Sequence, residues 1–270
     1  MTLVMVCQEA PERWWVVSDS RLTQPAGSGL KRLTDAGAKI LELPVTLFRP
    51  TVGDPFGEAI AKTTLGFAYS GSTLVALQAY AAVLPLWRRL QSTPHDILPS
   101  VEDFVRHLAQ FVKAYYLEIQ SPCQCILLGN NHGTGSAEAW VIEAGVFDTG
   151  DLSPKADVSV RRIDDTDAIS TFGTGGKAAN LWIERFKEGT GYAYPKSKIR
   201  NFIRDIVHED AQDVGGAVQI GMLIPNGFEL CFDVAQPTAG RPLPYMSYRG
   251  FEMNSISKIG PCITIMRGVT

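Results

Sequence analysis

Residues 14–19, Trp-Trp-Val-Val-Ser-Asp, decide how the beginning of the chain folds. Aromatic and β-branched side chains favour a strand, and this run ends on a charged cluster. Another apolar run, residues 3–9, precedes it, and Pro-Glu-Arg at 11–13 separates the two as a turn. The pattern therefore predicts a β-hairpin that starts at the very first residues of the chain.

More strands are expected in the first part of the chain, near residues 39–43 and 65–69. Residues 23–29 are rich in Gly, Pro and Thr, so we expect a loop there. Residues 44–62 hold three prolines and two glycines, and we interpret this segment as a loop insertion.

Two long helices follow these strands. Residues 72–90 are rich in Ala and Leu and apolar nearly all round, which indicates a helix that is buried on most sides. Ser100 is a typical N-cap before an acidic first turn, and apolar residues continue at helical spacing to about Ile119.

The second half of the chain repeats this order of strands and then helices. Hairpins are predicted for 125–129 with 139–142, and for 218–224 with 228–232 across a Pro-Asn-Gly turn. Between them we expect three elements, namely a strand near 168–172, a helix opened by the glycines that follow it and reaching about Phe186, and a helix at 197–207.

This order predicts the fold class. Because the helices are grouped and do not alternate with the strands, the order does not predict a doubly wound parallel sheet. Two antiparallel sheets packed face to face, with a helix pair outside each, satisfy the order and give a four-layer αββα sandwich of the α+β class. We expect a single domain over 1–270, with an insertion at 44–62 and a C-terminal extension at 235–270.

Composition and charge exclude several classes of protein. The chain has 45% hydrophobic and 20% charged residues with a net charge of -3, which gives no drive toward nucleic acid or anionic membranes. The longest apolar stretch is too short to cross a bilayer, and the N-terminus has no basic region typical of a signal peptide. We expect a cytoplasmic protein whose five cysteines are free thiols.

Motifs for metals, phosphates and serine nucleophiles are weak or missing. Gly-Thr-Gly-Gly-Lys at 173–177 resembles a phosphate-binding loop but lacks the Walker spacing. The four histidines are scattered without metal-ligand spacing, and the chain contains no HExxH or GxSxG motif. We therefore expect no cofactor and no metal.

Thr2 remains as a candidate nucleophile. It follows Met1, and a small second residue permits removal of the initiator methionine. Removal would leave a hydroxyl and a free α-amine on one residue, and an amine with a pKa of about 8 can take the hydroxyl proton. Asp19 lies seventeen residues after Thr2, about what a tight hairpin needs to return to its start.

Four segments carry a resemblance to a known family. Residues 16–23, Val-Val-Ser-Asp-Ser-Arg-Leu-Thr, resemble the second-strand segment of proteasome β subunits, which belong to the N-terminal-nucleophile (Ntn) hydrolase superfamily. Ala-Lys-Ile at 38–40, Phe-Ala-Tyr-Ser-Gly-Ser at 67–72 and Gly-Thr-Gly at 173–175 are similar to later segments of that family and occur in the same order. This resemblance also implies the αββα fold.

The resemblance implies a role for each matched residue. Asp19 would support the active-site lysine and the N-terminal Thr2, and the charge of Lys39 would lower the pKa of the nucleophile or its amine. The backbone N–H of Gly71 would line the oxyanion hole, and Thr174 would contact the catalytic group.

The same resemblance implies the surroundings of the substrate. Tyr69 is expected near the substrate pocket, and Arg21 is a second candidate for substrate binding. Lys31, in a longer loop than the family has, competes weakly with Lys39 for the lysine position.

One family segment is altered in this chain. Where the family has Asp-x-x-Ser-Gly-Gly, residues 211–216 hold Ala211 at the aspartate position and Val214 at the serine position. Asp210 or Asp213 could substitute for the missing carboxylate, or the segment could be a structural glycine turn without one.

Two functions are consistent with this sequence. The first is a threonine-type hydrolase of peptides or other amides, active after loss of Met1. The second is a catalytically inactive, proteasome-like assembly subunit, which the altered segment favours. In either case the resemblance implies a homo-oligomer, and we expect no nucleic-acid or membrane partner.

Cys7 is rejected as a nucleophile because only twelve residues separate it from Asp19, too few for both strands.

Overall fold

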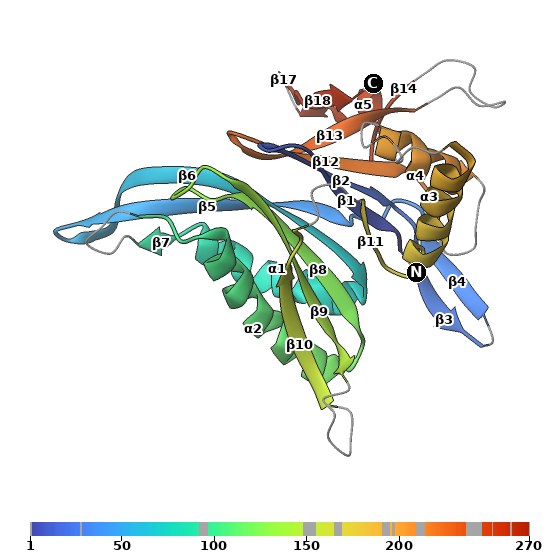
Figure 1. Ribbon diagram of the computed structural model, residues 1–270. Helices are drawn as coiled ribbons and strands as arrows, with labels where there is room; N and C mark the ends of the chain where they lie inside the picture. Colours follow the sequence, from blue (N-terminus) through green and yellow to red (C-terminus); the bar gives the residue numbers. More distant parts are fainter. Residues whose placement is uncertain are drawn as a thin grey trace.

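The computed structural model is of the α+β class and describes most of the 270-residue chain. The described residues are 2–27, 29–91, 97–147, 155–164, 169–190, 195, 198–208, 214–235, 245–249, 251–259 and 261–269. Within them, two large sheets carry most of the chain, and each sheet has two helices packed against it (Figure 1).

The first sheet is built around the N-terminal hairpin and has the strand order β11-β1-β2-β12-β13-β14-β15, with β18 paired to β13. The hairpin prediction is confirmed, since β1 pairs antiparallel with β2 across a turn at residues 11–12. The strands are β1 (Val4–Ala10), β2 (Arg13–Asp19), β11 (Ser170–Phe172), β12 (Val218–Ile224), β13 (Gly227–Ala235), β14 (Tyr245–Tyr248), β15 (Phe251–Glu252) and β18 (Arg267–Val269).

The second sheet has the order β10-β9-β8-β6-β5-β7. Its central strands are antiparallel, while the short β7 runs parallel to β5, as β18 does to β13 in the first sheet. The strands are β5 (Ile40–Thr51), β6 (Asp54–Gly71), β7 (Leu90–Gln91), β8 (Cys123–Asn130), β9 (Ala137–Phe147) and β10 (Lys155–Arg162).

Helices α1 (Thr73–Trp87) and α2 (Val101–Ile119) pack against the second sheet (Figure 1). Ser72 caps α1 by accepting a hydrogen bond from the backbone of Val75. Ser100 and Asp103 form a reciprocal capping box at the start of α2, as the sequence predicts. Both caps satisfy backbone N–H groups that would otherwise have no partner at a helix start.

Helices α3 (Gly176–Thr190) and α4 (Ile199–His208) belong to the first sheet, where α3 meets β11 and α4 meets β2 and β12. The remaining elements are small. They are the hairpin β3 (Leu22–Ala26) with β4 (Gly29–Thr34), the helical turn α5 (Met253–Ile256), and the pair β16 (Lys258–Ile259) with β17 (Cys262–Ile263).

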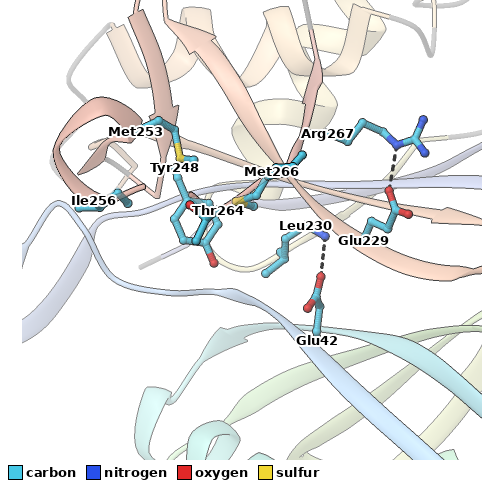
Figure 2. Close-up of a pocket in the computed structure, with 10 residues that line it drawn as sticks. Glu42, Glu229, Leu230, Tyr248, Met253, Ile256, Thr264, Met266 and Arg267 are labelled. Atoms are coloured by element: carbon cyan, nitrogen blue, oxygen red, sulfur yellow. Dashed lines mark hydrogen bonds and ion pairs between the residues drawn. The ribbon is translucent and has the colours of Figure 1, made fainter. Parts of the chain in front are cut away.

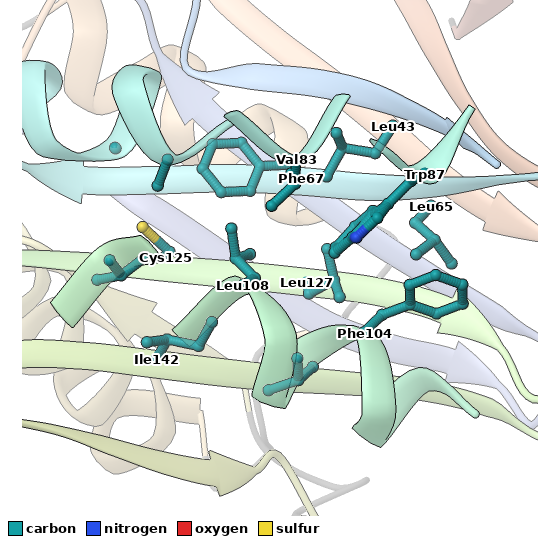
Figure 3. Packing of buried hydrophobic residues seen from close by; sticks show 14 of the residues in the cluster. Leu43, Leu65, Phe67, Val83, Trp87, Phe104, Leu108, Cys125, Leu127 and Ile142 are labelled. Carbon is teal, nitrogen blue, oxygen red and sulfur yellow. The ribbon is translucent and has the colours of Figure 1, made fainter. Parts of the chain in front are cut away.

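Three apolar clusters hold these elements together. Alternate residues from Leu3 into β1 enter different clusters: Leu3 and Met5 pack with α3 and α4, whereas Val4 and Val6 pack with residues of the second sheet. This alternation follows from the period of two in a strand and requires that both faces of the first sheet are covered. The largest cluster lies between the second sheet and its two helices, where Trp87 packs edge-on against Phe104 (Figure 3).

Two expectations for loops were wrong. Residues 23–29 were expected to be a loop, but 23–26 belong to β3 and Gly29 begins β4 of one hairpin. Residues 44–62 were interpreted as a loop insertion, but they are the distal half of a long antiparallel hairpin of β5 and β6 that turns at Val52 and Gly53. Strand β10 of the second sheet was not predicted, and neither were the C-terminal strands β14, β15 and β18, which join the first sheet.

None of the described helices is both long enough and apolar enough to cross a membrane.

Candidate active site

A buried ion pair lies where β2 ends and β5 begins. Lys39 Nζ is 2.8 Å from Asp19 Oδ1, and both side chains are fully buried. Three backbone N–H groups also donate hydrogen bonds to the Asp19 carboxylate. That of Leu3 donates to Oδ1 at 2.9 Å, and those of Arg21 and Gly215 donate to Oδ2 at 3.2 and 3.3 Å. Every oxygen of Asp19 therefore has a partner, as a buried charge requires.

Burial alters the acid–base chemistry of this pair. It lowers the pKa of Lys39 from its ordinary value of 10.5, because desolvation opposes the ammonium form more strongly than the Asp19 carboxylate supports it. At a given pH, a larger fraction of Lys39 is therefore neutral than of an exposed lysine. The sequence alone could not give this direction, since it depends on how deeply the side chain lies.

Asp19 also fixes the start of the chain. Besides the hydrogen bond from the Leu3 backbone to its carboxylate, its own backbone N–H donates to the carbonyl of Leu3 at 3.3 Å. The Ser18 hydroxyl donates to the same carbonyl at 2.9 Å. The residue that follows Thr2 is thus held on both its N–H and its C=O, which sets the position of Thr2.

The segment at 173–175 holds Thr2 from the other side. The backbone N–H of Gly175 donates to the carbonyl of Thr2 at 3.3 Å. Gly173 has φ +86°, and a Cβ on it would lie 2.1 Å from that same carbonyl oxygen. Only glycine fits this place, because both the backbone conformation and the close approach exclude a side chain.

A pocket of about 620 Å³ opens beside Thr2. Three of the predicted site residues, Thr2, Gly71 and Thr174, line it together. Its volume suits a small ligand or a short segment of peptide. The other lining residues are Ser70, Pro122, Cys123, Gln124, Glu143, Ala144, Gly145, Phe147, Gly173 and Lys177.

Gly71 ends β6 at the edge of this pocket with φ +83°. A Cβ at this position would lie 2.6 Å from the carbonyl oxygen of Pro122. The glycine therefore has a structural reason to be present, whichever role its backbone N–H has toward a substrate.

Gly173→Ala is expected to destabilise the protein and to displace Thr2. The left-handed backbone and the contact with the Thr2 carbonyl together predict a loss of about 1–3 kcal/mol in the free energy of unfolding. Chemical denaturation measures this, and Gly189→Ala is the control, because a Cβ there meets no atom within 4 Å. Equal stability of the two variants would contradict the close approach described here.

The two residues predicted to bind substrate lie elsewhere. Tyr69 is fully buried in the core under α1, where its hydroxyl donates to the carbonyl of Ala38 at 2.8 Å and burial raises its pKa to about 12. Arg21 is almost fully buried and pairs with Asp35, its Nε lying 2.7 Å from Oδ1. Neither residue is among those that line the pocket beside Thr2.

The altered segment is visible only in part, because Asp210, Ala211 and Asp213 lie outside the described residues. Val214 is buried in the apolar cluster that also contains Leu3. Gly215 packs on the ion pair: its N–H donates to Asp19, and its carbonyl accepts from the backbone of Arg21 at 3.0 Å. The described end of this segment is a glycine turn that supports Asp19 through its backbone.

Two glutamines were missed by the sequence reading. Gln219, buried in β12, donates to the carbonyls of Gly37 and Asp19 and accepts from the backbone of Lys39 at 3.0 Å, so it fixes the entry of the lysine into the site. Gln124 of β8 lines the pocket itself. The available signal was a single polar residue inside an otherwise apolar strand, such as Val-Gln-Ile-Gly at 218–221.

A larger pocket, of about 790 Å³, lies away from this site between β5, β13 and the C-terminal segment (Figure 2). It contains none of the predicted site residues. Glu42 accepts a hydrogen bond from the backbone of Leu230 at 2.9 Å, and Glu229 pairs with Arg267. No group of three or more His, Cys, Asp or Glu residues suited to a metal ion occurs in the described part of the chain.

Comparison with known proteins gives structural likeness alone. No protein-family model matches the chain, and no curated protein matches it. A chain of the helical assembly of the Anbu complex from Pseudomonas aeruginosa aligns with TM-score 0.52 and 13% identity, covering 84% of this chain and 85% of that chain. Anbu (ancestral beta-subunit) from Yersinia bercovieri aligns with TM-score 0.50 and 12% identity, covering 84% and 83%. The fold is proteasome-like.

The family assignment drawn from the sequence was wrong. The resemblance placed the chain in the Ntn hydrolase superfamily as a proteasome β-subunit-like protein, but no family model or curated protein supports this, and the similar structures are Anbu chains. Part of the matched pattern has a structural cause. Gly71 and Gly173 are required by the backbone at a strand end and a tight turn, so they indicate the fold without identifying a family.

Proposed function

We propose that this protein hydrolyses amide bonds in peptides or related substrates, with Thr2 as the nucleophile after removal of Met1. The observation that carries the proposal is that Thr2, Gly71 and Thr174 line one pocket. The buried Lys39–Asp19 pair supports it, because Asp19 also bonds to the backbone of Leu3, one residue from the nucleophile.

The reaction follows from the groups on Thr2. Its hydroxyl oxygen attacks the substrate carbonyl carbon, while its α-amine takes the hydroxyl proton. The tetrahedral oxyanion is stabilised by backbone N–H groups, for which Gly71 is the candidate. The C–N bond then breaks, the proton passes to the leaving amine, and an ester on Thr2 remains. Water hydrolyses this ester, which releases the carboxylic acid and restores the threonine.

Lys39 and Asp19 act beside this reaction. The positive charge of Lys39 favours loss of a proton from the hydroxyl or the ammonium of Thr2, and burial lowers the pKa at which this charge is lost. Asp19 keeps the lysine in place and fixes the backbone after Thr2. We assign Thr174 a contact with the reacting group, because it lines the same pocket as Thr2.

We also infer a four-layer αββα order for the fold. The three apolar clusters support it: one lies between α1, α2 and the second sheet, one between the two sheets, and one between the first sheet and α3 with α4. A homo-oligomer is part of the proposal as well, since the similar chain from Pseudomonas aeruginosa occurs in a helical assembly.

A second function has one observation in its favour. Val214, which occupies the position where the resemblance expects a supporting serine, is buried among apolar residues and offers no hydroxyl. A protein with this fold and an incomplete site would serve as an inactive assembly subunit. It would form an oligomer but would not react with an electrophile at residue 2.

Mass spectrometry separates the two functions. Intact-mass measurement of the purified protein is expected to show loss of Met1, and incubation with a peptide epoxyketone, which reacts with a threonine hydroxyl and its free α-amine, is expected to add one inhibitor mass. Peptide mapping should place the adduct on residue 2. Retained Met1, or an oligomer that takes up no inhibitor, would contradict the proposed hydrolase and favour the assembly subunit.

A further inference from the structure

Three polar side chains lie in one row across the second sheet. Ser70 of β6 is directly opposite Gln124 of β8, and Gln124 is directly opposite Glu143 of β9. All three residues line the pocket beside Thr2. Residues opposite one another on neighbouring strands are close enough for their side chains to interact, so the sheet itself brings this row together.

The amide of Gln124 is bonded at both ends. Its Oε1 accepts from the Ser70 hydroxyl at 3.0 Å and from the backbone N–H of Gly173 at 3.0 Å. Its Nε2 donates to Glu143 Oε1 at 2.7 Å. Because two donors meet its oxygen and a carboxylate meets its nitrogen, the amide has one favourable orientation, which Glu143 determines.

These contacts join the two sheets at the pocket. Gly173 follows β11 of the first sheet, and its close approach to the Thr2 carbonyl leaves no room for a side chain. Ser70 comes directly before Gly71, the candidate oxyanion donor. One side chain therefore connects the segment that contacts the nucleophile with the segment that would contact the developing oxyanion.

We propose that Gln124 is a positioning residue for the reaction at Thr2, oriented by Glu143. The inference rests on the proposed function. Gln124 acts through Gly173 and Ser70: it holds the distance between Thr2 and Gly71, and so places the hydroxyl and the oxyanion donor on the same carbonyl group. A displacement of about 1 Å between such groups can lower a rate about 100-fold.

Other charged groups face this row. The Arg161 guanidinium, on β10, lies 3.9 Å from Glu143 Oε1, and Lys177, in the first turn of α3, lines the same pocket. In the native protein, Glu143 accepts the hydrogen bond from Gln124.

Two variants and their combination test this inference. Gln124→Met removes all three hydrogen bonds and is expected to slow epoxyketone labelling of Thr2 about 10- to 100-fold at every pH. Gln124→Glu keeps an acceptor for Gly173 and Ser70 but sets two carboxylates against each other. One of them must then bind a proton to keep the row intact, so labelling should be near native at low pH and should fall as the pH rises.

The swapped pair is the double variant Gln124→Glu with Glu143→Gln. It again has one donor and one acceptor, but the carboxylate is now at position 124 and the amide is at position 143. It is expected to recover the labelling rate and to show the pH profile of the native protein, which a merely structural role of Gln124 would not predict. Gln91→Glu, at an exposed position of β7, is the control for an added charge.

The outcomes distinguish the inference from the function on which it rests. Absence of labelling in the native protein overturns the proposed function and this inference with it. A labelled native protein whose Gln124→Met and Gln124→Glu variants react at the native rate overturns the inference alone. A swapped variant that is as stable as the native protein but does not regain the rate also overturns it.

Discussion

Replacing Thr2 with alanine is expected to abolish epoxyketone labelling and to lower any amidase rate by about 10³-fold or more, the range found when a nucleophile is removed. Alanine is small, so removal of Met1 should continue and the free α-amine should remain. The backbone at the Thr2 carbonyl and at Leu3 is held independently of the Thr2 side chain, by Gly175 and by Asp19. The variant should therefore keep its fold.

Two further variants complete this test. Thr2→Ser retains both reactive groups and is expected to react with the inhibitor, whereas Thr134→Ala, in an exposed turn, should label at the native rate. Rates are measured by intact mass against time, with circular dichroism as the check on folding. An inhibitor adduct that forms as fast on Thr2→Ala as on the native protein would place the nucleophile at another residue.

Local sequence signals predicted much of the fold because local physics determines those elements. The two hairpins in the middle of the first sheet, β1 with β2 and β12 with β13, follow from apolar runs around short turns, and the start of α2 follows from Ser100 and Asp103. Where the chain departed from expectation, the reason is in the pairing of its strands.

The prolines in β5 illustrate such a reason. Pro44 cannot donate to a strand ladder, which is why the segment was interpreted as a loop. On the side away from β6, the described part of β5 is paired only at Leu47 and Phe48, so Pro44 can face an open edge there. Pro50 lies at an irregularity in the register between Arg49 and Thr51. Both positions tolerate proline, but this could not be recognised from the sequence, because it depends on how the neighbouring strands pair.

The candidate site, like the fold, could be predicted from the sequence only in part. Asp19 and Lys39 were singled out because their segments resemble those of proteasome β subunits, and their side chains are 2.8 Å apart. Gln124, Glu143 and Gln219 could not be predicted, since each is a polar residue inside a mostly apolar strand and its role depends on partners from distant segments. The structural similarity to Anbu chains supports the fold alone. The proposed chemistry rests on the contacts described above.

The second large effect is expected at the buried ion pair. Lys39→Met removes the cation 2.8 Å from Asp19 and leaves a carboxylate without a counterion in a fully buried place. Loss of one partner of such a pair destabilises a protein by about 3–5 kcal/mol. The hydrogen bonds from Leu3, Arg21 and Gly215 offset part of the cost, so folding is retained at reduced stability and labelling of Thr2 is lost.

A double-mutant cycle separates charge from packing. Asp19→Asn combined with Lys39→Met contains neither charge, so it should be less destabilised than the sum of the single variants, with a coupling of about 0.5–3 kcal/mol. Additive losses would mean that the two side chains contribute independently, contrary to the pairing described here. Urea denaturation of the native protein and the three variants at one pH gives the four free energies.

The pH dependence of the same cycle tests the acid–base state of Lys39. Burial lowers its folded pKa below 10.5, so between that pKa and 10.5 the unfolded chain binds more protons than the folded one. Stability from this group therefore rises with pH in that interval, and Lys39→Met should remove the rise. A native protein and a Lys39→Met variant whose stabilities change in parallel with pH would show that Lys39 is not desolvated as its burial requires.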